Sequence, residues 1–150
     1  MFNLGQAEVL ELSQARLDKL TPDRRARWGK MSAPEMVCHL SDSFRFALNL
    51  KVASDASGVL QRTLVKWIAL YVPVQWPKGV ATTPEMKQGV GGTCPAEFER
   101  DKSELAKLMR EFAGQEKFSV AHPIFGRMSL WEWQRWGYLH TDHHLRQFGL

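Results

Sequence analysis

Apolar residues recur along most of the chain at intervals of three and four positions, the spacing of one face of an α-helix. The pattern predicts helices over residues 3–20, 32–50, 58–72, 95–112 and 129–148. The second and the last each open with a capping box, in which a Ser is followed three positions later by a Glu. No stretch has the composition and alternation of a β-strand. The sequence therefore predicts an all-α chain with four substantial helices and a shorter one, packed as a bundle.

The apolar faces of these helices supply the expected core. In the first predicted helix the inward positions are Val9, Leu10, Leu12, Leu17 and Leu20. In the second they are Met36, His39, Leu40, Ser43, Phe46, Ala47 and Leu50. In the third, one shared face carries Val59, Leu60, Thr63, Leu64, Trp67, Ile68 and Tyr71. Residues 73–95 are instead interrupted by Pro and Gly, and a connection of that length is often a lid or a binding loop.

Composition and charge agree with a folded chain and argue against nucleic-acid binding. The 150 residues are 44% hydrophobic and 24% charged, which provides enough apolar side chains for a core and predicts one domain over residues 1–150. The net charge of +4 is mildly basic, and the densest basic run, Arg24 to Lys30, is expected to be solvated. Because no zinc-finger, RNA-binding or basic-zipper motif is present, we expect no nucleic-acid partner.

The sequence also lacks the features of a membrane or secreted protein. Its longest apolar stretch, residues 65–74, contains Lys66 and Pro73 and is too short to cross a bilayer. Cys38 and Cys94 are too few for a disulfide scaffold, and no signal peptide is visible. We therefore expect a cytoplasmic protein without a membrane partner.

Three of the five histidines lie on faces that should point into the bundle. His140 and His144 are four residues apart, so on a helix they differ by only about 40° in direction. They continue the apolar stripe of Trp133 and Gly137, and such a pair can supply two ligands to one metal ion. His39 lies on the apolar face of the second predicted helix and is the candidate for a third ligand.

The spacing alone leaves two interpretations open: a metal site, or core histidines that are satisfied by hydrogen bonds. The neighbouring His143 is rotated by about 100° from His144 and should point elsewhere, while His122 precedes a proline in a predicted turn. The last helix is not that of a thermolysin-type protease, because Thr141 stands where that motif has its catalytic Glu. For Arg127 and Arg146 we expect surface salt bridges.

Several motifs resemble the DinB/YfiT-like superfamily of metalloenzymes, and most closely its DUF1569 branch of bacterial domains of unknown function. The motifs are Trp28-Gly29-Lys30-Met31-Ser32-Ala33, Met36-Val37-Cys38-His39-Leu40, His122-Pro123-Ile124-Phe125-Gly126 and His140-Thr141-Asp142-His143-His144-Leu145-Arg146-Gln147-Phe148-Gly149. The resemblance covers most of the chain. It implies a four-helix bundle with long crossover connections. It also implies a divalent metal, usually zinc or nickel, held by His39, His140 and His144.

The resemblance also bears on function, since some members of the superfamily are transferases or isomerases that use low-molecular-weight thiols, and many form dimers. Three neutral imidazoles would leave a metal with an open position and its full charge, as in catalytic sites. We therefore expect transfer of a low-molecular-weight thiol cosubstrate to a small electrophilic substrate, and a homodimer. The alternatives are a metal-assisted hydrolase and a non-catalytic metal-binding or vestigial helical module.

Overall fold

A computed structural model describes residues 1–80 and 83–150. Its α-helices are α1 (Ala7–Asp18), α2 (Ala33–Ala47), α3 (Lys66–Tyr71), α4 (Phe98–Ala113) and α5 (Leu130–Gln147). A π-helical turn, η1 (Gln61–Val65), leads into α3, and a 3-10 turn, η2 (Pro84–Met86), lies in the connection that follows. The described ranges contain no β-strand, only an isolated bridge between His122 and Gly126. The prediction of an all-α chain is confirmed, although α1 is shorter than expected at both ends.

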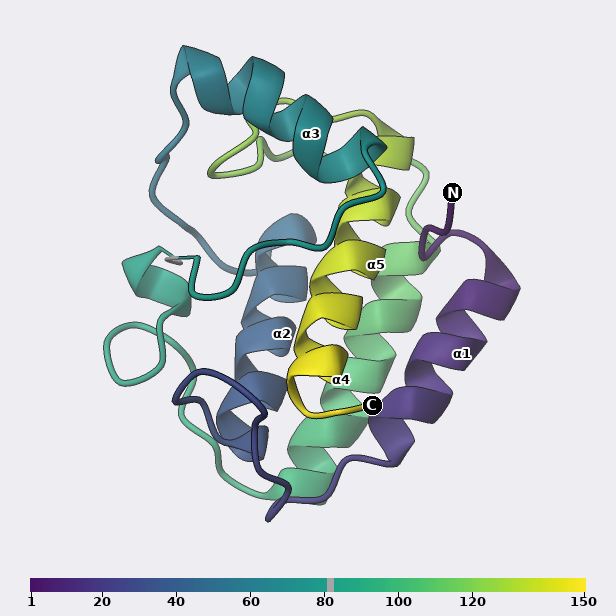
Figure 1. The fold of residues 1–150 in the computed structure, drawn as a ribbon, viewed down its shortest axis with the longest axis vertical. Helices are drawn as coiled ribbons and strands as arrows, with labels where there is room; N and C mark the ends of the chain where they lie inside the picture. Colours follow the sequence, from purple (N-terminus) through teal and green to yellow (C-terminus); the bar gives the residue numbers. More distant parts are fainter. Residues whose placement is uncertain (81–82) are drawn as a thin grey trace.

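The four longer helices lie side by side, and α3 lies across one end of them (Figure 1). Helix α1 packs against α4 and α5, and α2 packs against the same two helices, so the four contacts close a ring around a common core. Helix α3 packs on α5. None of the helices in the described part of the chain is both long and apolar enough to cross a membrane.

Both predicted capping boxes are present and fix the starts of the two helices that carry the candidate ligands. The Ser32 hydroxyl accepts from the backbone N–H of Glu35 at the start of α2, and Ser129 accepts from Glu132 at the start of α5. In each box the Glu carboxylate accepts from the backbone N–H of the Ser. Because a helix start fixes the direction of every later side chain, these caps set the register of the histidines downstream.

The core fills the space between the four longer helices. Its largest fully buried side chains are Trp133, Phe44, Phe112, Phe148, Leu4, Leu17, Leu20, Met36, Leu40, Leu70, Leu105 and Met109. Gly137 leaves room on α5 for the ring of Phe112 from α4, because a Cβ there would lie 2.6 Å from Cε1 of that ring. Two predicted core positions are wrong: Leu12 and Leu50 are 66% and 65% exposed. Leu12 lies on the outer side of α1, and Leu50 lies beyond the end of α2.

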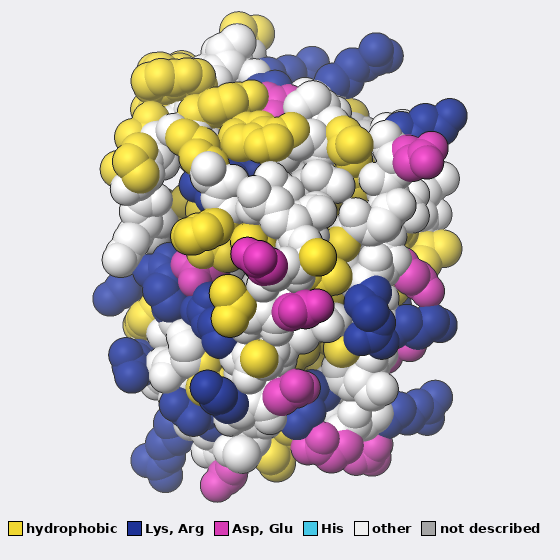
Figure 2. All heavy atoms as spheres, turned by 90° about the vertical axis from the view of Figure 1, so that its right-hand side faces the viewer, with side chains coloured by type: hydrophobic (Ala, Val, Ile, Leu, Met, Phe, Trp, Pro, Cys, Tyr) yellow, Lys and Arg dark blue, Asp and Glu magenta, His cyan; other side chains and the backbone are white. Residues whose placement is uncertain are grey.

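The apolar face predicted for the third helix exists, but most of it faces solvent. Its exposed members are Val59, Leu60, Leu64, Trp67, Ile68 and Tyr71. Hydrophobic side chains gather at the end of the molecule where α3 lies (Figure 2). Polar contacts hold α3 on α5: Arg135 donates to the carbonyl of Leu70, and Lys66 pairs with Glu132 at 3.1 Å. Leu70, which is not part of that predicted face, is the buried side chain of α3.

The long connection between α3 and α4 is fastened to the helices at several points. Trp76 donates from its indole nitrogen to the carbonyl of Ala69 at the end of α3. Farther along, Thr93 donates two hydrogen bonds to Asp42, a fully buried carboxylate on α2. Burial raises the pKa of Asp42, but the bonds from Thr93 and Lys51 outweigh burial and hold it below its ordinary value. The connection is thus held against α2, on the side that carries His39.

Candidate metal centre

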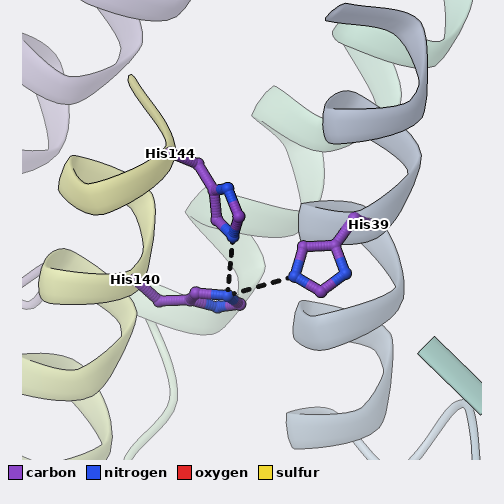
Figure 3. Close-up of side chains that lie close together, drawn as sticks. All are labelled: His39, His140 and His144. Atoms are coloured by element: carbon purple, nitrogen blue, oxygen red, sulfur yellow. Dashed lines mark hydrogen bonds between the residues drawn. The ribbon is translucent and has the colours of Figure 1, made fainter. Parts of the chain in front are cut away.

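The side chains of His39, His140 and His144 meet between α2 and α5 (Figure 3). Nε2 of His140 lies 3.2 Å from Nε2 of His39 and 3.2 Å from Nε2 of His144. One ring nitrogen from each of the three lies within 4.8 Å of those of the others. The structure thus brings together the three histidines that the sequence singled out, in a group that could hold a metal ion.

His39 is oriented by the connection that packs over α2. Its Nδ1 lies 3.1 Å from the backbone oxygen of Met86, in η2. A carbonyl oxygen only accepts hydrogen bonds, so Nδ1 of His39 carries the proton and Nε2 presents a lone pair to the other two rings. Metal-binding histidines usually donate such a hydrogen bond from the ring nitrogen that does not bind the metal.

His144 is oriented by Gln147, one turn later on α5. Its Nδ1 lies 2.9 Å from Oε1 of Gln147, and the Gln147 amide nitrogen donates to the backbone oxygen of Trp28 at 2.9 Å. Because the Trp28 carbonyl can only accept, the amide must turn its nitrogen toward Trp28 and its oxygen toward His144. The Nδ1 of His144 is therefore a donor, and its Nε2 also presents a lone pair to the centre.

His140 stands between the other two and has no such support. Its Nδ1 is buried and has no hydrogen-bond partner among the described residues. Two lone pairs, from His39 and His144, face its Nε2, and a proton on that atom can satisfy only one of them. The protein alone therefore leaves at least one of these lone pairs unsatisfied, in addition to Nδ1 of His140, which is costly in a buried place. A cation at the centre would satisfy all three nitrogens together.

Two of the three spacings between the nitrogens match those around one small ion. Imidazole nitrogens bind zinc at about 2.0–2.1 Å, which places neighbouring nitrogens of a tetrahedral site about 3.3 Å apart. The two distances of 3.2 Å lie close to that value. The donor set is three neutral nitrogens, a set accepted by zinc, nickel, copper and iron.

Burial keeps these rings neutral, the form in which histidine binds a metal. Burial lowers the pKa of His39 below its ordinary value and lowers that of His144 to about 3. The pKa of His140 lies well below its ordinary value, first because of burial and then because of the neighbouring histidines. Their nitrogens therefore stay free of a second proton at neutral pH.

Aromatic rings enclose His140. The ring of Trp136 lies 5.1 Å from that of His140, between centroids, and the ring of Trp76 lies 6.2 Å from it. Trp136 comes from the preceding turn of α5, whereas Trp76 comes from the long connection. The connection predicted to be a lid or a binding loop thus contributes Trp76 beside His140 and the Met86 carbonyl at His39.

The remaining histidines have other surroundings. His143 lies outside the group, with its ring 5.9 Å from that of Trp28, as its rotation on the helix predicted. His122 is a buried core residue whose Nδ1 accepts from the backbone N–H groups of Ile124 and Phe125. Burial lowers the pKa of His122 to about 3.

Other reactive side chains do not join the centre. Cys38 is buried beside Asp101 of α4, and burial together with that carboxylate raises the pKa of its thiol to about 11. Cys94 is exposed. Asp142 pairs with Arg16 and with Arg146, each at 2.8 Å, and lies outside the group.

Sequence reasoning missed Met86, Trp76 and Gln147. Met86 and Trp76 lie in a segment whose apolar residues follow no regular spacing. No sequence pattern could therefore have placed them against α2 and α5. Gln147 had a usable signal, because it follows His144 by three positions and side chains at that spacing are neighbours on a helix.

Among known proteins, the chain matches one family. The family model DUF1569, whose description is "Protein of unknown function", matches residues 6–149. No curated protein matches the chain, and no solved structure matches it.

Proposed function

We propose that this chain, which belongs to the DUF1569 family of proteins of unknown function, holds one divalent metal ion between His39, His140 and His144. The observation that carries the proposal is the convergence of three Nε2 atoms, two of which are turned inward by hydrogen bonds on the far side of the ring. Zinc or nickel suits the three imidazoles and is the metal we propose.

The proposal extends to the architecture. We assign α1, α2, α4 and α5 to a four-helix bundle of the DinB/YfiT-like type, within a single domain. The closed ring of contacts between these helices supports that assignment, as do the two long connections, at residues 48–97 and 114–129. An experimental structure compared with members of that superfamily would test it.

The reaction we propose is transfer of a low-molecular-weight thiol to a small electrophilic substrate. Bound there, a divalent ion with three neutral ligands would act as a Lewis acid and lower the pKa of a coordinated thiol or water. The chain itself provides neutral, oriented imidazoles and an aromatic wall from Trp76 and Trp136. A thiol from solution is needed because Cys38 stays protonated at neutral pH and Cys94 lies outside the group.

The test uses untagged protein that is stripped of metal, reloaded with zinc or nickel and assayed with 1-chloro-2,4-dinitrobenzene and related electrophiles. We expect turnover that requires both metal and an added thiol, that is lost in His144→Ala, and that is retained in the control Lys107→Met, which removes an exposed cation from α4. Turnover without a thiol would instead support the metal-assisted hydrolase. Tight metal binding without turnover in a broad screen would leave a non-catalytic module.

The oligomeric state and the location remain proposals. A homodimer has a candidate contact face in the exposed apolar side chains of η1 and α3, which include Trp67 and Ile68. Light scattering of the wild-type chain and of Trp67→Ser would test this, since the substitution should shift the mass toward that of the monomer. The cytoplasmic location also stays a prediction.

A further inference from the structure

A cavity of about 310 Å³ opens next to the three histidines, on the outer side of His143. Two indole rings, Trp28 and Trp76, form part of its wall, and the side chains of Arg27, Lys78 and Arg146 also line it. This volume is at the small end of the range for small-molecule sites. The cavity therefore suits a molecule of metabolite size.

The charge of this cavity is unbalanced. Among the ion pairs of the described residues, Arg146 is matched by Asp142, whereas neither Arg27 nor Lys78 pairs with a carboxylate. Asp142 also pairs with Arg16, which in addition donates to the main-chain oxygen of Leu150 at the edge of the cavity. Two unmatched cations thus face one small space, and an anion in it would be attracted by both.

Each cation lies against a neighbouring residue at the edge of the cavity. The Lys78 ammonium lies 4.7 Å from the centroid of the Trp28 ring, a cation–π contact. The Arg27 guanidinium passes over Gly149, where a Cβ would come within 2.5 Å of its Nε. Gly149 therefore leaves room for this placement of the Arg27 side chain.

The cavity shares its wall with the histidine centre. The Trp76 ring lies 6.2 Å from His140 and 6.4 Å from His143, so one indole borders both spaces. The backbone oxygen of Trp28 is bonded to Gln147, the residue that orients His144. A molecule seated in the cavity would therefore lie beside the centre, with Trp76 and His143 at the border between the two spaces.

We propose that this cavity binds the carboxylate of a small organic acid with a flat or apolar body. The carboxylate would be bound by Arg27 and Lys78, and the body would pack against the indole of Trp76. We further assign this acid to the thiol cosubstrate, whose sulfur would reach the histidine centre. This last assignment rests on the proposed function, whereas carboxylate binding does not.

Calorimetric titration of the metal-free full chain with benzoate, and with neutral benzamide as the matched ligand, tests the cavity. We expect benzoate to bind more tightly than benzamide, and added salt to weaken it. The double variant Arg27→Met, Lys78→Met should lose about tenfold or more in benzoate affinity. Lys107→Met, which removes an exposed cation from α4, should bind as the wild type does. Both replaced side chains are exposed, so the double variant is expected to fold. Equal affinity for benzoate and benzamide, or an unchanged double variant, would overturn the proposal.

A second titration separates this proposal from the proposed function. In zinc-loaded protein, 3-mercaptobenzoate should bind more tightly than benzoate, and this gain should vanish in His144→Ala while benzoate binding persists. If benzoate binds selectively but the thiol gives no metal-dependent gain, the carboxylate site stands and the thiol assignment is overturned. If the thiol gains affinity but the double variant binds benzoate normally, the metal site stands and the carboxylate site is overturned.

Discussion

Replacing Gln147 by Met should weaken metal binding, although Gln147 contacts His144 only at Nδ1, the ring nitrogen that faces away from the centre. The substitution keeps the length and much of the volume of a buried side chain. It removes the acceptor of the proton on Nδ1 of His144 and the donor to the backbone oxygen of Trp28. Without that acceptor, His144 can place its proton on Nε2, the atom it would otherwise offer to the metal.

The size of the effect follows from the kind of contact that is lost. Loss of the outer hydrogen-bond partner of a metal-binding histidine typically costs 10–100-fold in metal affinity, which is about 1.4–2.7 kcal/mol. Because His144 is buried, water cannot readily replace the lost acceptor, so we expect the upper half of that range. The same change should lower the free energy of unfolding by about 1–3 kcal/mol, since the Trp28 carbonyl loses its partner.

Affinity should be measured by competition with a calibrated zinc chelator, at a temperature where circular dichroism shows both proteins folded. Gln147→Glu is the matched control: like Met it loses the donor to the Trp28 carbonyl, but its carboxylate can still accept from His144 and makes the imidazole a stronger base, so its affinity should exceed that of Gln147→Met. If Gln147→Met binds zinc as tightly as the wild type while His144→Ala does not, orientation of His144 by Gln147 is irrelevant to binding.

Three further predictions concern the other histidines and the core. His143→Gln should lower zinc affinity by less than about tenfold. His140→Gln should lower it by more than the 10–100-fold that is typical when a hydrogen-bond partner of a metal ligand is lost. The reverse order in chelator competition would contradict the assigned helical register. The folded-state pKa of His122 is depressed to about 3, so its contribution to stability is complete above the unfolded pKa of about 6.5 and is lost as pH falls toward 3. In urea titrations of metal-free protein, the free energy of unfolding should decline as the pH falls below about 6.5. The slope of this decline against pH should be smaller in His122→Gln, by up to about 1.4 kcal/mol per pH unit. Identical slopes in the two proteins would show that the His122 ring is protonated in the folded state. Gly137→Ala should lower the free energy of unfolding by about 1–3 kcal/mol despite the better helix propensity of Ala, because the new methyl group would strike the ring of Phe112, and an unchanged urea midpoint would contradict that contact.

The main helices could be predicted because their signals are local. Apolar spacing gave the positions of α2, α4 and α5, and two capping boxes gave the starts of α2 and α5 to the residue. The orientation of the third helix could not be predicted in this way. A periodic stripe shows that a helix has an apolar face, but which side packs depends on partners such as Arg135, which bonds the Leu70 carbonyl from another helix.

In the candidate site, too, the local features could be predicted and the tertiary contacts could not. His140 and His144 share a face because of their spacing within one helix, and His39 could be found because it interrupts an apolar face. The contacts that orient the rings depend on tertiary structure, since the Met86 carbonyl reaches His39 from η2 and the Trp28 carbonyl holds Gln147 from before α2. Backbone carbonyls carry no sequence signal, so these two partners become visible only once the chain is folded.

The most direct test of the account is the metal content of untagged protein after loading with zinc and extensive desalting. Elemental analysis should find close to one ion per chain in the wild type, and almost none in a chain with His39, His140 and His144 all replaced by Gln. The replaced chain should keep its helical circular dichroism, since most of the core is apolar packing. One ion per chain in the triple variant, or none in the folded wild type, would contradict the proposed centre.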